Sequence, residues 1–226
     1  LRRKRILNSQ SHLHITPFKD DHDASNEPSK MAPHDLSSRW VGRVAVLAPS
    51  RKVFVLGRHS WATPATHGHD GGEEILVLDG VLSDEAGDYP AGTYLMNPPG
   101  SSHAPHSKSG CTLFVKLRHL GPDQVAREVV DTTTEPWLQG MVPGLNVMPL
   151  MRQGTGSTLV RWAPGTYFNP HRHFGGEEIF VVSGVFEDEH GRYPAGSWVR
   201  SPHMSAHQPF SQEGCTIFVK TGHLWA

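Results

Sequence analysis

The sequence predicts an all-β protein made of two tandem antiparallel β-barrels that are related by internal duplication. Residues 67–116 align without a gap over residues 171–220 and share 28 identities in 50 positions, at a constant offset of 104. Within each copy, short runs of Val, Ile, Leu, Phe, Tyr and Trp alternate with turn-forming clusters such as GG, DEAGDYPAG and NPPG. This rhythm is typical of a β-sandwich or barrel. A solenoid needs several stacked units, so two copies predict two self-contained lobes.

The length and charge of the chain limit the classes of protein to which it can belong. With 226 residues, it is long enough for one large all-β domain or two small domains. Its 21 Lys and Arg residues balance 22 Asp and Glu residues, and the dense basic run covers only residues 2–5, so we expect no nucleic-acid partner. No apolar stretch approaches the roughly 20 residues of a membrane span, and the first residues lack the apolar segment of a secretory signal. We therefore expect a cytoplasmic protein without a membrane partner.

The two cysteines, Cys111 and Cys215, occupy equivalent places in the runs GCTLFVK and GCTIFVK. Two cysteines are too few for a disulfide framework. We expect small buried thiols rather than a redox pair.

The predicted strands follow the repeat. In each copy, one strand is expected after the Gly-Gly pair, a second after the Pro-Ala-Gly turn and a third after the cysteine. Four more strands are expected from apolar runs outside the repeat. The segment 122–131 fits a helix or a strand, and its periodicity does not decide between them. The expected strands are 44–47, 53–56, 75–78, 93–96, 113–116, 145–148, 158–161, 179–182, 197–200 and 217–220.

Composition divides the chain into four segments. Residues 1–39 are mostly polar, and we expect a tail that is disordered or lies against the first lobe. The first barrel is expected over residues 40–121, a linker over residues 122–136 and the second barrel over residues 137–226.

Each copy contains three histidines and one glutamate at identical spacing. The two histidines of an H-x-H pair point to one face of a strand, because residues two apart on a strand lie on the same side. The Gly-Gly pair that follows permits a tight reversal, so that the glutamate returns beside the histidines. A later strand must bring the third histidine to the same point. The predicted metal ligands are His67, His69, Glu73 and His103 in the first copy and His171, His173, Glu177 and His207 in the second.

Three imidazoles and one carboxylate suit a borderline divalent ion, with one ion expected in each barrel. Zinc and iron are the first candidates, and manganese, nickel, cobalt and copper are alternatives. A hard ion such as calcium would need more oxygen ligands. The other interpretation is that these residues recur only because the whole segment was duplicated. However, neighbouring positions have diverged, since Phe174 replaces Asp70 and Arg172 replaces Gly68, and this favours metal binding.

Two motifs resemble those of the cupin family. The pattern H-x-H-x3-E-x6-G occurs over residues 67–80 and 171–184, and G-x5-P-x-G-x2-H occurs over residues 92–103. The strings GGEE, DYPAG or RYPAG, NPPGSSH and EGCTIFVK are more specific, and through them residues 40–226 resemble the ChrR-like cupin family. The resemblance implies a bicupin, in which each jelly-roll barrel holds a metal through the ligands named above. In the second copy PHMSAH replaces P-x-G-x2-H, so the loop before His207 is expected to differ.

Other polar residues are expected to serve the fold. Glu74 and Glu178 should face away from the metal ligands, in salt bridges or in solvent. His106 and His203 lack a counterpart in the other copy and are expected at the surface, with a role beside the metal as the alternative. No catalytic role is expected for the acidic pairs of the hairpin turns, which are Asp84 with Glu85 and Asp188 with Glu189.

One difference between the copies concerns charge. Met96 in the first copy corresponds to Arg200 in the second. If this position faces the metal, the two cavities differ in charge.

Two functions remain as hypotheses. The ChrR resemblance implies a metal-binding sensor or regulatory module without catalysis. ChrR also has an N-terminal zinc-containing domain that holds a sigma factor, but residues 1–39 contain no cysteine, so we expect no direct sigma-factor capture. The alternative is a metal-dependent oxygenase that acts on a small ketone or phenol, because related cupins include iron dioxygenases.

Motifs of other enzyme classes do not occur in the sequence. There is no dinucleotide-binding glycine pattern that opens a helix, no phosphate loop and no nucleophile elbow. We assign no catalytic residue and no cofactor other than the metal. The expected partners are metal ions and a small molecule in the barrels, and a homodimer is an open alternative because barrel edges can pair.

Overall fold

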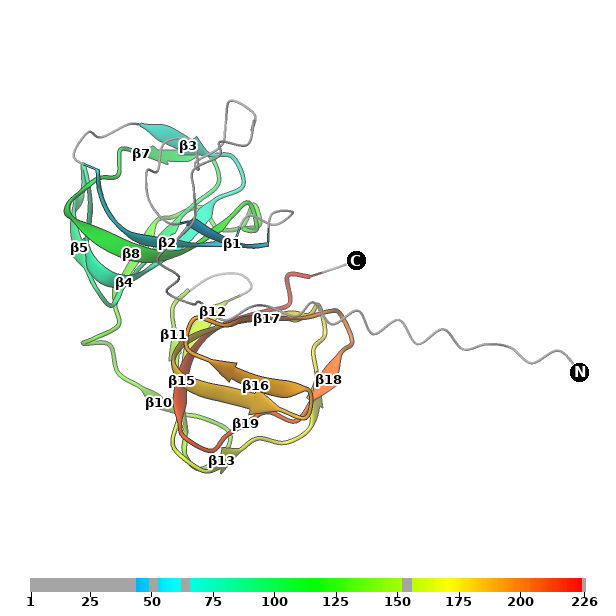
Figure 1. The fold of residues 1–226 in the computed structure, drawn as a ribbon. Helices are drawn as coiled ribbons and strands as arrows, with labels where there is room; N and C mark the ends of the chain where they lie inside the picture. Colours follow the sequence, from blue (N-terminus) through cyan, green and yellow to red (C-terminus); the bar gives the residue numbers. More distant parts are fainter. Residues whose placement is uncertain (1–43, 49–52, 62–65, 152–155, 225–226) are drawn as a thin grey trace, which may run out of the picture.

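The computed structural model describes residues 44–48, 53–61, 66–151 and 156–224. The regular secondary structure in these ranges consists of β-strands. They form two curled sheets, one in each half of the chain, and Figure 1 shows the two barrels with β10 following the connection between them. These ranges contain no helix, and thus none that could cross a membrane. The predicted all-β fold of two tandem antiparallel barrels is confirmed. The predicted tail, residues 1–39, lies outside the described residues.

The first barrel is built around one long strand, β4. Its sheet has the order β1, β2, β8, β4, β6, β9, and β5 pairs with the far end of β4. A separate two-stranded sheet joins β3 to β7. The strands are β1 Val44–Ala48, β2 Val53–Trp61, β3 His67–His69, β4 Glu73–Asp84, β5 Gly87–Pro90, β6 Thr93–Asn97, β7 Ser101–His103, β8 Ser107–Leu117 and β9 Glu128–Asp131.

The second barrel repeats this plan around β15. Its sheet has the order β10, β11, β12, β20, β15, β19, β13, with β16 and β17 also paired to β15. A separate two-stranded sheet joins β14 to β18. The strands are β10 Leu138–Gln139, β11 Leu145–Pro149, β12 Ser157–Trp162, β13 Thr166–Tyr167, β14 His171–Arg172, β15 Glu177–Asp188, β16 Gly191–Pro194, β17 Trp198–Ser201, β18 Ala206–His207, β19 Phe210–Ser211 and β20 Cys215–Thr221.

Strands β4 and β15 each continue well past the apolar run that predicted them. β4 pairs with β8 as far as Gly80 and with β5 from Val81 onward, so it bends from one side of the barrel to the other. Gly80 has a φ of +76°, and a Cβ there would lie 2.1 Å from the carbonyl oxygen of Gly110. Gly184 repeats this in β15, with a φ of +72° and the same distance to the oxygen of Gly214. Only glycine accommodates this backbone approach, which lets one strand serve both sides of its barrel.

Part of the predicted linker belongs to the first sheet. β9 runs antiparallel to β6, with Asp131 opposite Thr93. The undecided segment 122–131 therefore ends in a strand, and β10 then opens the second sheet by pairing with β11.

Each barrel has an apolar core, and a third cluster of buried residues joins the two barrels. In this third cluster Phe114 of β8 stacks on Phe180 of β15, with ring centroids 4.4 Å apart. Cys111 and Cys215 lie in the two barrel cores as free thiols, as predicted. Burial raises the pKa of each thiol to about 11.

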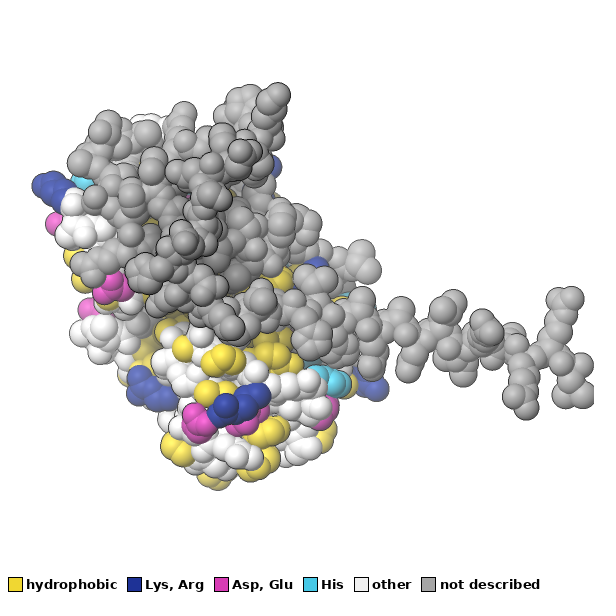
Figure 2. Space-filling model, in the orientation of Figure 1, with side chains coloured by type: hydrophobic (Ala, Val, Ile, Leu, Met, Phe, Trp, Pro, Cys, Tyr) yellow, Lys and Arg dark blue, Asp and Glu magenta, His cyan; other side chains and the backbone are white. Residues whose placement is uncertain are grey.

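Surface charges of opposite sign lie close together on the second barrel. Figure 2 shows basic side chains beside acidic ones on the face in view. Arg192 of β16, for example, pairs with Glu187 of β15 and with Glu213. This local pairing agrees with the near-balance of charge in the sequence.

Candidate metal centres

The predicted ligands of the first copy converge on one point. His67 and His69 lie on β3 and His103 lies on β7, and the two strands pair with His67 opposite His103. Glu73 is the first residue of β4. Each of the four side chains offers one donor atom, and these atoms all lie within 4.8 Å of one another. The structure therefore brings together all four residues that the spacing predicted.

The second copy repeats this arrangement. His171 of β14 lies opposite His207 of β18, His173 follows β14, and Glu177 opens β15. The four donor atoms again lie within 4.8 Å of one another. The three imidazole rings have centroids 4.6 to 4.9 Å apart.

Glycines place the glutamate beside the histidines, as predicted. Gly72 has a φ of +72°, and its N–H donates to the carbonyl of His69, which closes the reversal between β3 and β4. A Cβ at this position would lie 2.5 Å from a methyl carbon of Leu120. Gly176 has the same role before Glu177, with a φ of +73°.

The loop before His207 keeps the conformation of its counterpart, and the expected difference is wrong. Met204 occupies the place of Gly100 and has a φ of +63°, close to the +81° of the glycine. The Met204 N–H donates to the carbonyl of His173, just as the Gly100 N–H donates to that of His69. The turn is imposed by these hydrogen bonds, so the methionine adopts a left-handed conformation that its side chain disfavours.

The buried donor atoms fit a metal ion. In each cluster, the Nε2 atoms of two buried histidines have no hydrogen-bond partner among the described residues, namely those of His69, His103, His173 and His207. Leaving a buried polar atom without a partner costs about 1–3 kcal/mol. Several such atoms that face one point are explained by a cation as their shared partner.

Burial keeps imidazoles of both clusters neutral and opposes the charge of the carboxylates. Together with the neighbouring histidines, it lowers the pKa of His69 and His173 to about 3. It raises the pKa of Glu73 and Glu177 to about 7. Neutral imidazoles can offer lone pairs to a metal at once, whereas a protonated glutamic acid must first lose its proton.

A buried aspartate holds one histidine of each cluster from behind. Asp84 Oδ2 lies 3.3 Å from Nδ1 of His103, and Asp188 Oδ2 lies 3.2 Å from Nδ1 of His207. With Nδ1 engaged in this way, each imidazole presents Nε2 to the centre of its cluster. The sequence places both aspartates in hairpin turns, and this position predicts no part in the site. The identical interval of 19 residues from aspartate to histidine in both copies could have revealed them.

A comparison with models of known protein families shows to which family the chain belongs. The model of the ChrR cupin-like domain matches residues 53–121 and 125–225, which is more than half of the chain. The chain belongs to the ChrR-like cupin family. It is a bicupin, since each of its two barrels matches the family. Comparison with curated protein sequences finds no match.

Solved structures share the bicupin fold at low sequence identity. A candidate dioxygenase from Nostoc punctiforme PCC 73102 has a TM-score of 0.60 and 13% identity, over 80% of this chain and 78% of that chain. Protein YlbA from E. coli has a TM-score of 0.56 and 16% identity, over 75% of each chain. Oxalate decarboxylase from Bacillus subtilis, which has Mn(II) centres, has a TM-score of 0.53 and 14% identity, over 77% of this chain and 69% of that chain. These likenesses concern the fold alone.

Glu74 and Glu178 of the bicupin face away from the clusters, into the space between the barrels. They are only 1% and 3% exposed, so the alternative of solvent exposure is wrong. Lys220 lies 3.1 Å from Glu74 and Lys116 lies 2.6 Å from Glu178, and each lysine comes from the opposite barrel. The alternative of salt bridges is therefore confirmed. The next residue after each ligand glutamate contacts the other barrel because strand neighbours point to opposite faces.

The difference in charge between Met96 and Arg200 does not affect the cavities of the clusters, because these side chains do not face them. Met96 is buried in the cluster between the barrels, and Arg200 Nε lies 3.6 Å from Glu178 on that same side of the sheet.

The two histidines without counterparts, His106 and His203, are half-buried rather than fully exposed. Nδ1 of His203 accepts a hydrogen bond from the Gly175 N–H at 2.9 Å.

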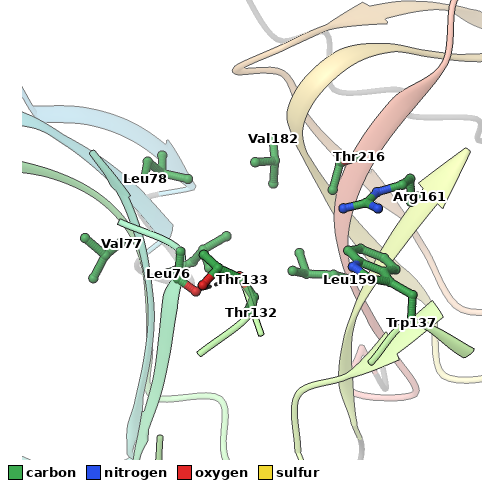
Figure 3. A pocket seen from close by; sticks show the side chains of 11 residues that line it. Leu76, Val77, Leu78, Thr132, Thr133, Trp137, Leu159, Arg161, Val182 and Thr216 are labelled. Atoms are coloured by element: carbon green, nitrogen blue, oxygen red, sulfur yellow. Dashed lines mark hydrogen bonds between the residues drawn. The ribbon is translucent and has the colours of Figure 1, made fainter. Parts of the chain in front are cut away.

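A cavity of about 460 Å³ lies between the barrels, apart from both clusters (Figure 3). Leu76 and Leu78 of β4 face it from the first barrel, and Leu159 of β12 faces it from the second. Arg161 lies over the ring of Trp137 at one side, 4.0 Å from the ring centroid. None of the eight predicted metal ligands lines this cavity.

Proposed function

We propose that each barrel of this bicupin binds one divalent transition-metal ion through three histidines and one glutamate. The observation that carries the proposal is the convergence of four donor side chains at one point in each barrel, within 4.8 Å of one another. The buried Nε2 atoms at these points, which lack hydrogen-bond partners among the described residues, support it further. The proposed ligands are His67, His69, Glu73 and His103 in the first barrel and His171, His173, Glu177 and His207 in the second.

Zinc or iron is the ion that we propose first. Imidazole nitrogen and a single carboxylate oxygen are donors that borderline divalent ions prefer. Manganese, nickel, cobalt and copper are alternatives, because the same donor set also serves them.

Elemental analysis of the purified chain tests this proposal. We expect about two transition-metal ions per chain in protein from metal-replete cells, one for each cluster. A control protein with His69→Ala and His173→Ala should keep its fold and lose the metal. Fewer than about half an ion per chain, even after reconstitution, would contradict the proposal.

We propose a sensor or regulatory module as the role of these centres. Membership of the ChrR-like family supports this role. The carboxylates behind the clusters, Asp84 and Asp188, are engaged with ligand histidines, so they support the ligands rather than act on a substrate. In such a module, loading of the centres would change the stability of the barrels without turnover of a substrate.

One observation favours an oxygenase as the second candidate. His67 and His171 are half-buried while the other ligands are buried, so one edge of each cluster is open to a small molecule. A bound divalent ion would supply Lewis acidity and lower the pKa of a bound water to about 7. The four protein donors would leave coordination positions free for a substrate.

A dioxygen-consumption screen separates the two roles. Iron-loaded protein is offered small ketones, phenols and thiols, and oxygen uptake is followed with an electrode. Uptake that requires a substrate and disappears in the His69→Ala and His173→Ala control would establish the oxygenase. Protein that holds two ions and consumes no oxygen with any of them would support the sensor.

A further inference from the structure

The two clusters have the same four ligands but different surroundings. In the first barrel, Asp84 Oδ2, which faces His103, also accepts a hydrogen bond from Arg127 Nη2 at 2.6 Å. Asp84 Oδ1 accepts two more, from the Ala86 N–H and from the Tyr89 hydroxyl, both at 2.8 Å. Arg127 directly precedes β9, and the pairing of β9 with β6 brings its guanidinium behind the cluster. The negative charge of Asp84 is therefore shared between His103 and a permanent cation.

The second barrel lacks this cation among its described residues. Asp188 Oδ1 accepts hydrogen bonds from the N–H groups of His190 and Gly191 at 2.8 and 3.0 Å and from the Tyr193 hydroxyl at 3.2 Å. Asp188 Oδ2 lies 3.2 Å from Nδ1 of His207. Backbone N–H groups and a hydroxyl are neutral donors, so Asp188 keeps more of its charge for the histidine.

The surroundings of the two ligand glutamates differ in the same direction, because only the first glutamate has an additional hydrogen-bond donor among the described residues. The Oε2 atom of Glu73, which faces the histidines, accepts a hydrogen bond from Asn97 Nδ2 at 3.0 Å. Asn97 lies opposite Glu73 in the pairing of β4 with β6. Ser201 takes its place opposite Glu177, and Oε2 of Glu177 has no hydrogen-bond partner among the described residues.

Both differences make the first cluster the poorer electron donor. A carboxylate on Nδ1 raises the basicity of a ligating imidazole, and a guanidinium on that carboxylate weakens the effect by competing for its charge. A hydrogen-bond donor on the ligating oxygen of Glu73 likewise reduces the charge that this oxygen offers to a metal. The positive charge of Arg127 also repels a cation in the cluster, and burial limits the screening of this repulsion by salt.

We propose that the two metal centres are unequal, with the first binding a divalent ion more weakly than the second, and that Arg127 is the positioning residue that weakens it. This inference rests on the proposed binding of one ion by each cluster. Changes behind a metal ligand alter affinity by about 10- to 100-fold, so we expect the dissociation constants of the two centres to differ by such a factor. The second barrel would then hold its ion tightly, while the ion of the first barrel exchanges with the free pool.

Proteins with one intact centre measure each site alone. His173→Ala leaves the first cluster and His69→Ala leaves the second, in both cases in the full-length chain. Zn²⁺ is titrated in competition with a chromophoric chelator, and the first centre is expected to have a Kd about 10- to 100-fold higher. Equal Kd values, or a tighter first centre, would overturn the inference.

Substitution of Arg127 in the protein with only the first centre tests its role. Arg127→Met removes the charge and is expected to tighten Zn²⁺ binding by about 10-fold. Arg127→Lys keeps a positive charge and is expected to leave the Kd close to that of the parent protein. If Arg127→Met binds no tighter than Arg127→Lys, Arg127 is not the cause. Arg127→Gln removes the charge but keeps an N–H donor for Asp84, and it gives the same comparison if Arg127→Met does not fold.

The same titrations distinguish this inference from the proposed function. Binding of Zn²⁺ by neither one-centre protein, with the fold intact by circular dichroism, would overturn both. Binding by both with equal affinity would overturn the inequality alone. Ser201→Asn in the protein with only the second centre gives Glu177 a donor like that of Asn97, and it should raise the Kd of that centre.

Discussion

Asp84 and Asp188 define the histidine geometry of the centres without being ligands themselves. Each accepts a hydrogen bond from Nδ1–H of one histidine of a cluster and is buried behind it. Burial acts to raise the pKa of Asp188, but hydrogen bonds from His207 and from the backbone outweigh it and lower the pKa. The aspartate therefore stays charged and can hold the imidazole in the tautomer that presents Nε2.

Asp188→Asn is expected to weaken Zn²⁺ binding at the second centre by about 10- to 100-fold, because the amide holds the imidazole less well and offers it no charge. The measurement is the Zn²⁺ titration in the His69→Ala background. Glu213→Gln is the matched control, since Glu213 is an exposed carboxylate that pairs with Arg192 rather than with a histidine of the cluster. Equal effects of the two substitutions would show that Asp188 has no special role.

The pKa of Glu73 predicts how pH affects the metal-free protein. Burial raises this pKa to about 7, above the value of 4.5 that applies to the unfolded chain. The contribution of Glu73 to stability is therefore present in full below pH 4.5 and is lost as the pH rises through about 7.

Glu73→Gln, which stays neutral, should consequently stabilise the metal-free protein more at pH 8 than at pH 5. The expected difference between the two pH values is on the order of 2 kcal/mol. Urea unfolding of wild-type and variant protein in the presence of a chelator measures it. A benefit of the same size at both pH values would mean that the carboxyl group is already ionised at pH 5.

At the scale of elements, the bend in β4 allows one strand to carry a glutamate of the proposed metal centre at its start and an aspartate behind the histidines at its end. Glu73 opens the strand and Asp84 closes it. Gly80 lies between them at the point where the strand changes partners. The same bend at Gly184 gives β15 its Glu177 and Asp188. The supporting aspartate thus depends on the bend as much as on its own side chain.

Gly80→Ala is expected to destabilise the protein by about 1–3 kcal/mol more than Gly100→Ala, as measured by chemical denaturation. Both glycines have a positive φ, +76° and +81°, so both substitutions strain the backbone. Only at Gly80 does the added Cβ meet another atom, the oxygen of Gly110 at 2.1 Å, whereas nothing lies within 4 Å at Gly100. Equal losses would mean that backbone strain, rather than close approach, makes glycine necessary at the bend.

At the scale of the whole molecule, salt bridges between charged residues of one barrel and charged residues of the other join the two halves. Lys116 of the first barrel pairs with Glu178 of the second, and Lys220 of the second pairs with Glu74 of the first. The repeat relates these two pairs, so the interface has an approximate twofold symmetry. Burial acts to raise the pKa of Glu74, but Lys220 and His119 outweigh it and hold the pKa well below its ordinary value. These charges are buried away from water, so each one is stabilised by its partner of opposite sign.

Lys220→Met should destabilise the protein by about 3–5 kcal/mol, because it leaves the buried charge of Glu74 without its lysine partner. The double variant Lys220→Met with Glu74→Gln should recover much of this loss, since no unpaired charge then remains. Chemical denaturation of the two single variants and the double variant measures the coupling. A double variant whose loss equals the sum of the single losses would show that the two residues do not interact.

Recurring spacing predicted the ligands of both centres, but it could not predict their surroundings. His67, His69 and Glu73 are neighbours in the sequence. Strand geometry places the two histidines on one face, and the Gly-Gly reversal returns Glu73 beside them. Arg127 lies 43 residues from Asp84, and Lys220 lies 146 residues from Glu74. Sequence spacing carries no information on such contacts until the pairing of strands is known.

The sequence by itself determined the duplication, the β class of the fold and the eight side chains that meet in the two proposed metal centres. Strand periodicity and turn residues are patterns of a few positions, and they are easy to recognise here because both copies of the repeat show the same patterns. Only the tertiary structure decided which carboxylates stand behind the histidines, that the first cluster has an arginine at its back, and that the lysines pair across the barrels. These features depend on the closure of each barrel and the packing of one barrel on the other, which bring distant residues into contact and remove the water between them.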